Sequence, residues 1–394
     1  MNKCDYLLPV YRRADVKMVR GEGVYLYDDG NCEYLDFAAG IATSSLGHNH
    51  PAMVGALVAQ ASKLWHCSNM FRNQPLEDFA QALCDACFAD KVFFCSSGTE
   101  AVEAAIKIIR RYHYVKGNNR SLIIAADGAF HGRTTGALAA CSNPASKQGF
   151  APLMNGFAHV GFNDIAAIYS LNPQEIAAIM LETIQGEGGV RPHSPAYLQA
   201  VRAWCDEHDV LLFLDEIQCG YGRTGHFMAY EMAQITPDIV TVAKGIGGGF
   251  PLAATLCTEK AASGMSVGTH GSTYGSNPLA CAVGLAVFEV MNADGFLANI
   301  VEVGKLLANA LQSLAVDYPQ IFECARGVGL MQGLVLQPKI DKYGLAEQLR
   351  EAGLLVAPAV SNVIRILPPL IITAKHVEKA MAILHDVCYD DSYF

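Results

Sequence analysis

Short apolar runs alternate with longer amphipathic segments through the middle of the chain. The apolar runs are KVFFC (91–95), LIIAAD (122–127), IAAIMLE (176–182), 210–214, 239–243 and LAATLC (252–257). Such runs, bounded by polar residues or Gly, are typical of buried strands in a parallel sheet. The segments between them, such as VEAAIKIIRRYHYV and PAYLQAVRAWCDEHD, have the apolar spacing of helices. The alternation predicts an α/β fold, with a mostly parallel, doubly wound sheet and helices on both faces.

The two ends of the chain show a different pattern. GVYLYD and CEYLDF flank the turn at 28–31, which predicts a hairpin. Near the other end, GVGLMQGLVL, GLLVAPA and VIRILPPL predict strands with flanking helices. A chain of 394 residues is too long for one ordinary core. We therefore predict an N-terminal segment (1–52) that packs with a small C-terminal α+β domain (285–394), and a large domain (53–284) between them.

Composition limits the classes of partner. Hydrophobic residues make up 52% of the chain and charged residues 17%, so we expect extra apolar surface to be buried against a second copy of the chain. The formal charge of −10 and the absence of a basic run argue against a nucleic-acid partner. Because no apolar run reaches the ~18 residues of a membrane span, we predict no membrane partner.

The cysteine and histidine residues do not form a metal-binding pattern. Thirteen Cys are scattered without a framework or a signal peptide, which predicts free thiols in a reducing cytoplasm. Cys84 and Cys87 form a CxxC, but inside an amphipathic run, so half-buried helix positions are favoured over a redox or zinc role. His48 and His50 lack a third ligand at useful spacing, which favours turn-stabilising roles. No metal site is predicted.

Chemically active residues follow the predicted strands. The strand ends supply Gly98, Phe130, Glu182, Asp215 and Lys244. In an open α/β sheet, ligands bind outside the carboxyl ends of the strands. We therefore expect these residues to meet in one crevice.

Asp215 and Lys244 point to a specific chemistry. Lys244 lies between an apolar run and GIGGG, where desolvation lowers the pKa of an amine toward its nucleophilic form. An Asp on the neighbouring strand end can keep a pyridinium nitrogen protonated, and such a Lys and Asp are how proteins hold pyridoxal phosphate. The alternative is a strand-end salt bridge beside a Gly-rich turn.

The turn SSGTEA lies between a strand and a long amphipathic run. Ser97 and Glu100 fit a capping box, and the free N–H groups of a helix start can hold a phosphate. A plain helix cap is the alternative. The chain contains no GxxxxGK, so this turn is not a nucleotide P-loop.

Three further residues suit a flat, anionic ligand. Phe130 can cover a ring, and Arg133 can hold a carboxylate through two hydrogen bonds. Arg365 lies in an apolar stretch, and a buried Arg needs an anion, either a protein carboxylate or a ligand.

Six motifs occur together in a recognisable order: SSGTEA, GAFHGRT, QGEGG, LDEIQCGYGRTG, AKGIGGGFP and GSTYGSNPLA. In this order and spacing they resemble the class III pyridoxal-phosphate aminotransferases, which have the fold type I of pyridoxal-phosphate-dependent transferases. Within the class, the chain is most similar to the acetylornithine aminotransferase subfamily, some of whose members also act on succinyldiaminopimelate. The resemblance implies transfer of the side-chain amino group of N2-acetylornithine to 2-oxoglutarate, giving N-acetylglutamate 5-semialdehyde and glutamate in cytoplasmic arginine biosynthesis.

The resemblance also implies roles for individual residues. Those that contact the cofactor are Lys244 (Schiff-base lysine), Asp215 (pyridinium nitrogen), Gln218 (ring hydroxyl), Phe130 (ring face), and Gly98 and Thr99 (phosphate). Thr273 matches a phosphate ligand donated by the other subunit, which makes a homodimer part of the site. Arg133 and Ser272 match substrate contacts. Glu187 and Arg365 resemble a gating pair in which Arg365 is freed to bind the carboxylate of the second substrate.

Two positions depart from related patterns. Ile41 stands where ornithine aminotransferases usually have Tyr, and a smaller residue leaves room for an N-acyl group. Thr183 stands where the family usually has Pro, which puts the local turn before QGEGG in doubt.

Other functions compete with this interpretation. Another class III activity, with succinyldiaminopimelate, ornithine or 4-aminobutyrate as donor, or an internal amino shift, fits the same motifs. GIGGG could be the turn of a nicotinamide dehydrogenase, but the third Gly of GxGxxG would fall at Phe250, and the motif lies late in the fold. A non-catalytic binding protein of this fold would not need Lys244 and Asp215.

Overall fold

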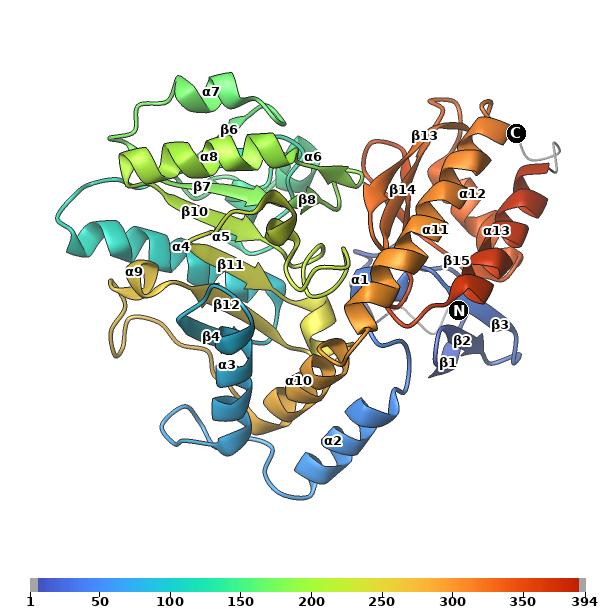
Figure 1. Ribbon diagram of the computed structural model, residues 1–394, viewed down its shortest axis with the longest axis horizontal. Coiled ribbons are helices and arrows are strands. Elements are labelled where there is room, and N and C mark those ends of the chain that lie inside the picture. Colours follow the sequence, from blue (N-terminus) through green and yellow to red (C-terminus); the bar gives the residue numbers. More distant parts are fainter. Residues whose placement is uncertain (1–5, 390–394) are drawn as a thin grey trace.

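The computed structural model describes residues 6–389 and contains two units, built on separate sheets (Figure 1). The larger unit has a seven-stranded sheet in the order β4-β12-β11-β10-β7-β5-β6. Its strands are β4 (Lys91–Cys95), β5 (Leu122–Ala126), β6 (Phe157–Val160), β7 (Ile176–Glu182), β10 (Leu211–Asp215), β11 (Ile239–Val242) and β12 (Ala253–Cys257). The predicted mostly parallel sheet is confirmed.

One strand of this sheet runs against the others. β12 pairs antiparallel with both of its neighbours, β11 and β4. A parallel return needs a crossover of about a dozen residues or more, usually a helix. The chain between β11 and β12 contains only the short 3-10 helix η2 (Lys244–Gly247) and a turn, so β12 returns in the opposite direction.

Both faces of the large sheet are buried under helices. Residues alternate between the two faces of a strand. Leu211 and Phe213 of β10 therefore pack in the cluster that contains α4, whereas Leu212 and Leu214 pack in the cluster that contains α8. The helices of this unit are α2 (Pro51–Ala61), α3 (Gln74–Ala86), α4 (Gly98–Val115), α5 (Thr135–Ala140), α6 (Pro144–Lys147), α7 (Ile165–Tyr169), α8 (Pro195–His208), α9 (Glu259–Ala262) and α10 (Pro278–Met291), with the 3-10 helix η1 (Ala229–Ala233). The two-stranded β8 (Ile184–Gln185) and β9 (Arg191–Pro192) lie beside this sheet.

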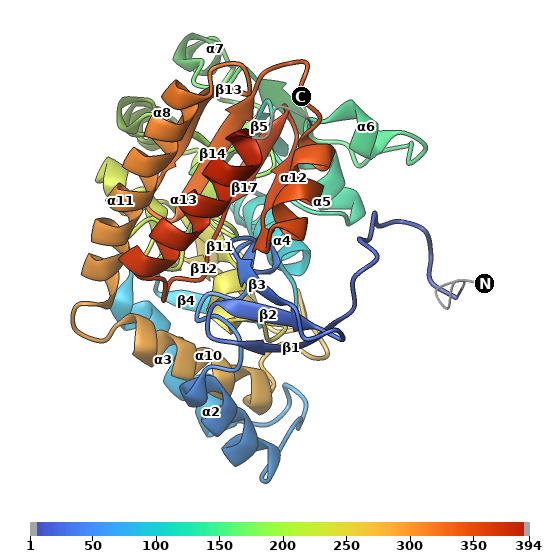
Figure 2. The ribbon, with the colours of Figure 1, turned by 90° about the vertical axis from the view of Figure 1, so that its right-hand side faces the viewer.

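The smaller unit has a four-stranded antiparallel sheet in the order β13-β14-β17-β16. Its strands are β13 (Phe322–Val328), β14 (Met331–Leu336), β16 (Ala357–Ala359) and β17 (Val363–Ile366). Its helices α11 (Phe296–Asp317), α12 (Lys342–Glu351) and α13 (Ala374–Tyr389) lie over the sheet in Figure 2. The prediction of one strand through GVGLMQGLVL is wrong, because Gly329 turns the chain at φ +56 between β13 and β14.

The N-terminal segment packs with the small unit. The predicted hairpin is confirmed as β2 (Tyr25–Asp28) and β3 (Glu33–Asp36), with β1 (Met18–Glu22) added at its edge and α1 (Ala39–Ala42) after it. β3 pairs in parallel with β15 (Leu354–Leu355), and Lys379 Nζ lies 2.9 Å from Glu33 Oε1. The borders at 52 and 284 stay predictions, and α10 runs across the second of them. Residues 1–5 and 390–394 of the predicted segments lie outside the described residues.

Other sequence predictions can be placed in this fold. His48 Nε2 lies 2.8 Å from Asp36 Oδ2, and His50 caps α2, so both histidines stabilise turns. Cys84 and Cys87 lie at the end of α3 as half-buried free thiols. Between residues 6 and 389, no group of His, Cys, Asp or Glu has the arrangement of a metal site. Over the same residues, no single helix is long and apolar enough to cross a membrane; α10 and α11 meet that test only as a pair, bent by 70°.

Candidate active site

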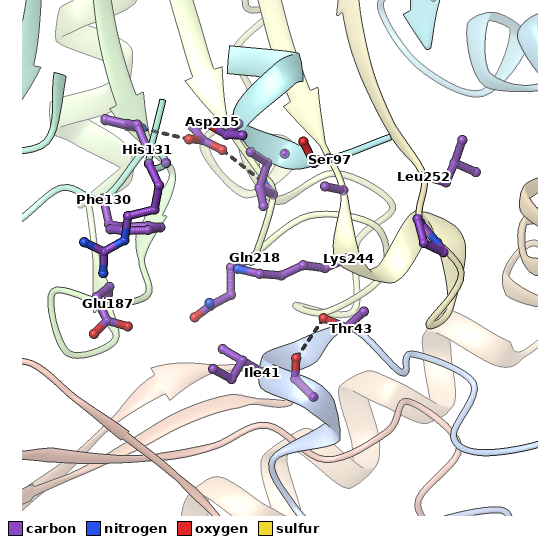
Figure 3. Close-up of a pocket in the computed structure, with 18 of the residues that line it drawn as sticks. Ile41, Thr43, Ser97, Phe130, His131, Glu187, Asp215, Gln218, Lys244 and Leu252 are labelled. Carbon is purple, nitrogen blue, oxygen red and sulfur yellow. Dashed lines mark hydrogen bonds and ion pairs between the residues drawn. The ribbon is translucent and has the colours of Figure 1, made fainter. Parts of the chain in front are cut away.

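A cavity of about 740 Å³ lies at the carboxyl ends of the parallel strands, where the large sheet meets the N-terminal segment and β17. All of the predicted site residues except Ser272 and Thr273 line it: Gly98, Thr99, Phe130, Arg133, Glu187, Asp215, Gln218, Lys244 and Arg365. Figure 3 shows Lys244 extending between Asp215 on one side and Ile41 and Thr43 on the other. The expectation of one crevice at the strand ends is confirmed.

Lys244 follows β11 and has an unusual backbone conformation. Its φ is +51, in the left-handed region that non-Gly residues avoid and that is found where a site requires it. Within residues 6–389 its amine has no hydrogen bond and no ion pair. Burial, reinforced by the positive charge of Arg365, lowers the pKa of Lys244 to about 8. Near physiological pH a larger fraction of this amine is therefore neutral and nucleophilic than for an ordinary lysine.

Asp215 ends β10 and is fixed by three donors. Its Oδ2 lies 2.7 Å from Nδ1 of His131, and its Oδ1 accepts from the Thr241 hydroxyl and the Ile217 amide, each at 3.1 Å. Since an ionised carboxylate only accepts, Nδ1 of His131 carries a proton. In the described chain the ion-pair partner of Asp215 is thus His131 and not Lys244, so the alternative of a strand-end salt bridge is wrong.

His131 was missed as a functional residue. It follows Phe130 in GAFHGRT, and its imidazole is buried against Asp215, with no partner for Nε2 among the described residues. The motif itself was the only signal, because no local spacing connects position 131 with position 215.

The predicted phosphate turn forms the start of α4. Ser97 is the N-cap, and its Oγ accepts from the Glu100 amide. Glu100 Oε2 accepts from the Ser97 hydroxyl at 2.8 Å, but its backbone donor is the Ser96 amide, at 3.1 Å, instead of the Ser97 amide. The capping box is thus displaced by one residue. A Cβ at Gly98 would lie 2.9 Å from Cδ1 of Ile217, so a larger residue there would have to displace the Ile217 side chain. The first amides of the helix, from Gly98 and Thr99, have no partner within the helix and can bind an anion.

An ion pair closes one side of the cavity. Arg365 NH2 lies 2.9 Å from Glu187 Oε2, and Arg365 also donates to Gln218 Oε1 and to the Pro358 carbonyl, both at 3.2 Å. The Arg365 side chain is 2% exposed, whereas that of Glu187 is 37% exposed. Burial lowers the pKa of Arg365, and Glu187 opposes that shift. Of the two anions expected for Arg365, the described chain supplies a protein carboxylate.

Glu182 connects the aromatic residue with the QGEGG loop. Its Oε1 accepts from the Phe130 amide at 2.9 Å, and its Oε2 accepts from the Gly186 amide at 3.0 Å. Burial raises the pKa of Glu182 to about 7. Beside it, the exposed guanidinium of Arg133 lies 5.3 Å from the centroid of the Phe130 ring, close enough for a cation–π contact at the cavity edge.

The two departures from related patterns have clear environments. The Thr183 hydroxyl donates to Glu216 Oε1 at 2.8 Å, and both side chains are buried. This bond ties the end of β7 to the end of β10, so the turn is held without a Pro. Ile41 is 43% exposed and faces the cavity beside Thr43 (Figure 3).

Ser272 and Thr273 lie outside the cavity of their own chain. Ser272 Oγ reaches Glu100 Oε1 at 3.4 Å, which places it behind the start of α4. Thr273 and the neighbouring Tyr274 are exposed.

These groups fit a pyridoxal phosphate. A buried, unpaired lysine and a carboxylate held for a ring nitrogen are the two groups that proteins provide for this cofactor. A helix start suits its phosphate, and Phe130 suits the face of its ring. The fold and the site together define a pyridoxal-phosphate-dependent enzyme of the α/β class.

Comparisons with known proteins identify the family. The model of the class III aminotransferases matches residues 9–388. The acetylornithine aminotransferase of Agrobacterium fabrum is 48% identical over 377 residues, or 95% of this chain and 94% of its own, and that of Caldanaerobacter subterraneus is 45% identical over 97% of each chain.

Solved structures agree with this relationship. The ornithine aminotransferase from Toxoplasma gondii, described with pyridoxal phosphate at its active site, has a TM-score of 0.93 and 31% identity over 98% of this chain and 93% of its own. The N-acetylornithine aminotransferase from Stenotrophomonas maltophilia has a TM-score of 0.83 and 36% identity over 96% and 97%. The chain belongs to the class III aminotransferases, and its cofactor is pyridoxal phosphate.

Proposed function

We propose that this enzyme transfers the side-chain amino group of N2-acetylornithine to 2-oxoglutarate, giving N-acetylglutamate 5-semialdehyde and glutamate. The observation that carries the chemistry is Lys244, a buried amine without a partner in the described chain, facing the cavity that Asp215 also lines. The choice of donor is supported by the names of relatives that are 48% and 45% identical to the chain. The reaction belongs to arginine biosynthesis, and the free thiols favour a cytoplasmic location.

Lys244 and Asp215 carry the chemical steps. When bound, pyridoxal phosphate supplies an aldehyde that takes up the amino group and a ring that accepts an electron pair from the reacting carbon. Lys244 is the residue that would hold the cofactor through its amine, and the freed amine would take the proton from the reacting carbon of the donor. A well-placed general base of this kind accelerates a reaction by ~10²–10⁴-fold. Asp215, fixed by His131, would keep a proton on the ring nitrogen of the cofactor.

The remaining cofactor contacts fix the orientation of the ring. Gly98 and Thr99 would hold the phosphate through the start of α4, Phe130 would cover the ring, and Gln218 would contact the ring hydroxyl; all four line the cavity. Thr273 holds the phosphate in the site of the partner subunit. Its exposure, and its absence from the cavity of its own chain, support this homodimeric arrangement.

Two arginines distinguish the substrates. Arg133 binds the α-carboxylate of the donor. Ser272, which lies outside the cavity of its own chain, would contact the donor in the site of the partner subunit, as Thr273 contacts the phosphate. Arg365 stays neutralised by Glu187 while the donor reacts, and 2-oxoglutarate then displaces Glu187 with its second carboxylate. Because the donor product leaves before the acceptor binds, the kinetics are ping-pong.

The two domains contribute different parts of the site. Residues 53–284 form the cofactor-binding domain, while 1–52 and 285–394 form a small domain that supplies Ile41 and Arg365 to the cavity. The pairing of β3 with β15 supports joining the two terminal segments in one domain.

Ornithine is the main competing donor, because the ornithine aminotransferase from Toxoplasma gondii has a TM-score of 0.93 with this chain. Succinyldiaminopimelate and 4-aminobutyrate are further alternatives. Ile41 is the residue that selects the amino donor, because a larger side chain at this position would occupy space beside Lys244 that an N-acyl group needs.

The test is the visible absorption spectrum of the purified enzyme before and after adding N2-acetylornithine without an acceptor. We expect an absorption band from the bound cofactor. Adding the donor should remove this band and form one equivalent of semialdehyde per bound cofactor. A band that responds only to ornithine or another amine would overturn the donor assignment. No band after incubation with pyridoxal phosphate would overturn the role of Lys244.

A further inference from the structure

The backbone of the loop that carries Glu187 is fixed at several points. The Gly186 amide donates to Glu182, and the Glu187 carbonyl accepts from the Val360 amide at 3.1 Å. The Gly189 carbonyl accepts from Nε of Arg326 at 2.9 Å. The loop is therefore held on both sides of Glu187. Before Glu187 it is fixed to the end of β7, and from Glu187 onward it is fixed to the small unit.

Arg326 and Arg365 lie in one row across that sheet. Gly333 of β14 stands directly opposite Arg326 of β13 on one side and Arg365 of β17 on the other. Directly opposed residues in an antiparallel sheet project from the same face. Both arginines therefore face the Glu187 loop, Arg365 through its ion pair and Arg326 through the Gly189 carbonyl.

Gly333, the residue between the two arginines, has no side chain, and Val190 of the loop packs against its backbone. A Cβ on Gly333 would lie 3.1 Å from Cβ and Cγ2 of Val190. Val190 is fully buried and has φ +53, a conformation that a β-branched residue adopts only when its surroundings impose it. The strained Val190 is thus an independent sign that the position of this loop is constrained.

Arg326 is half-buried and has no carboxylate partner within residues 6–389, so its hydrogen bond to the loop is not secondary to an ion pair. We propose that Arg326, Val190 and Gly333 form a clip that fixes the backbone beside Glu187, and that Arg326 is a positioning residue for the choice between the two substrates. The proposal rests on the proposed gating role of Glu187 and Arg365.

The clip has a different effect on each half-reaction. The donor half-reaction needs Glu187 on Arg365, because a buried guanidinium without a counter-charge is unfavourable. The glutamate half-reaction needs Glu187 to leave. Loosening the loop should therefore impair the first reaction and spare the second, whereas a general structural defect would impair both.

The experiment measures kcat/KM of each half-reaction in single-turnover absorption assays on the holoenzyme. For Arg326→Gln we expect a decrease of about tenfold with N2-acetylornithine, the size of effect that follows from losing one charged hydrogen bond, and less than about twofold with glutamate. Arg326→Lys, which keeps a charged donor where Gln offers only a neutral one, should restore part of the loss. Arg350→Gln, a half-buried arginine of α12 whose partners are Glu347 and Glu351, should change neither.

Glu187→Gln, alone and combined with Arg326→Gln, separates the positioning role proposed for Arg326 from the gating role proposed for Glu187 and Arg365. If Arg326 acts through Glu187, Arg326→Gln should change nothing further in the Glu187→Gln background. Equal losses in both half-reactions, or additive losses in the double variant, would overturn the clip. A Glu187→Gln variant with an unchanged ratio of the half-reactions would instead overturn the gating role.

Discussion

Nδ1 of His131 lies 2.7 Å from Oδ2 of Asp215, and both side chains are buried in the lining of the cavity. A carboxylate held in this way keeps its orientation, because the N–H of the imidazole donates to one of its oxygens. Predictions about the reaction follow from this and from the other contacts of the site.

Replacing His131 should lower turnover more than substrate binding. His131→Leu removes a hydrogen bond to a charged group, worth about 1.5–3 kcal/mol, so kcat should fall by about 10–100-fold. KM should change little, since His131 does not reach the Arg residues. Steady-state kinetics with both substrates test this. His131→Asn, which keeps a donor, should lose less, and a leucine variant with wild-type kcat would remove His131 from the chemistry.

Capture of the cofactor should depend on pH through Lys244. In cofactor-free enzyme the pKa of Lys244 is lowered to about 8, so the amine is mostly protonated below that pH. The rate of capture should rise about tenfold per pH unit up to pH 8 and level off above it. Stopped-flow mixing with pyridoxal phosphate measures this, with a free lysine derivative as control for titration of the cofactor. A rate that climbs steadily to about pH 10 would mean that the pKa of Lys244 is unshifted.

Arg133→Ala should weaken substrate capture without loosening the cofactor. Loss of a bidentate carboxylate contact at an exposed site should lower kcat/KM for both substrates by about 10–100-fold. The dissociation constant of pyridoxal phosphate, from fluorescence titration, should stay within about twofold of wild type. Arg72→Ala, on the surface before α3, is the control. Unchanged affinity for both substrates would exclude the role of Arg133.

Mixed dimers test whether Thr273 acts across the interface. Lys244→Ala should abolish turnover, and Thr273→Ala should weaken cofactor binding. When the two variants are refolded together, one site of each mixed dimer has both an intact Lys244 and an intact Thr273 from the other chain. Tight cofactor binding and turnover should then reappear, and the Lys305→Ala variant mixed with Thr273→Ala serves as a control for refolding. If Thr273 acts in its own chain, mixing should restore nothing.

Thr183→Val should destabilise the fold. The change leaves an oxygen of buried Glu216 without one of its donors, for a loss of about 1–3 kcal/mol in the free energy of unfolding. Thr183→Ser, which keeps the hydroxyl, should lose much less. Chemical denaturation of the holoenzyme measures both, and equal stability of the Val and Ser variants would show that the bond to Glu216 is not stabilising.

The strands and their chemically active ends could be predicted from the sequence for a physical reason. A strand buried on both faces must be apolar throughout, so 176–182 and 211–215 are visible as runs. The carboxyl ends of parallel strands share one edge, which brings Asp215 and Lys244 together without any knowledge of side-chain contacts.

Other features depend on contacts between distant residues and leave no local pattern. The bond of His131 to Asp215 joins positions 84 residues apart, and Thr183 meets Glu216 across two strand ends. The direction of β12 follows from the short connection after β11, which an apolar run alone does not indicate. The pairing of Glu187 with Arg365 was expected only from the family resemblance, since the two lie on different units.

The pairing of β3 with β15 also affects the order in which parts of the chain can fold during synthesis. During synthesis, Leu35 leaves the ribosome long before its partner Leu354, whereas the strands of the large sheet all lie between residues 91 and 257. The large sheet can therefore assemble on the nascent chain, but the N-terminal strands must wait with an unpaired edge until translation is nearly finished. Arg365 is synthesised after every strand of the large sheet, so a chain that ends before it lacks this residue of the cavity.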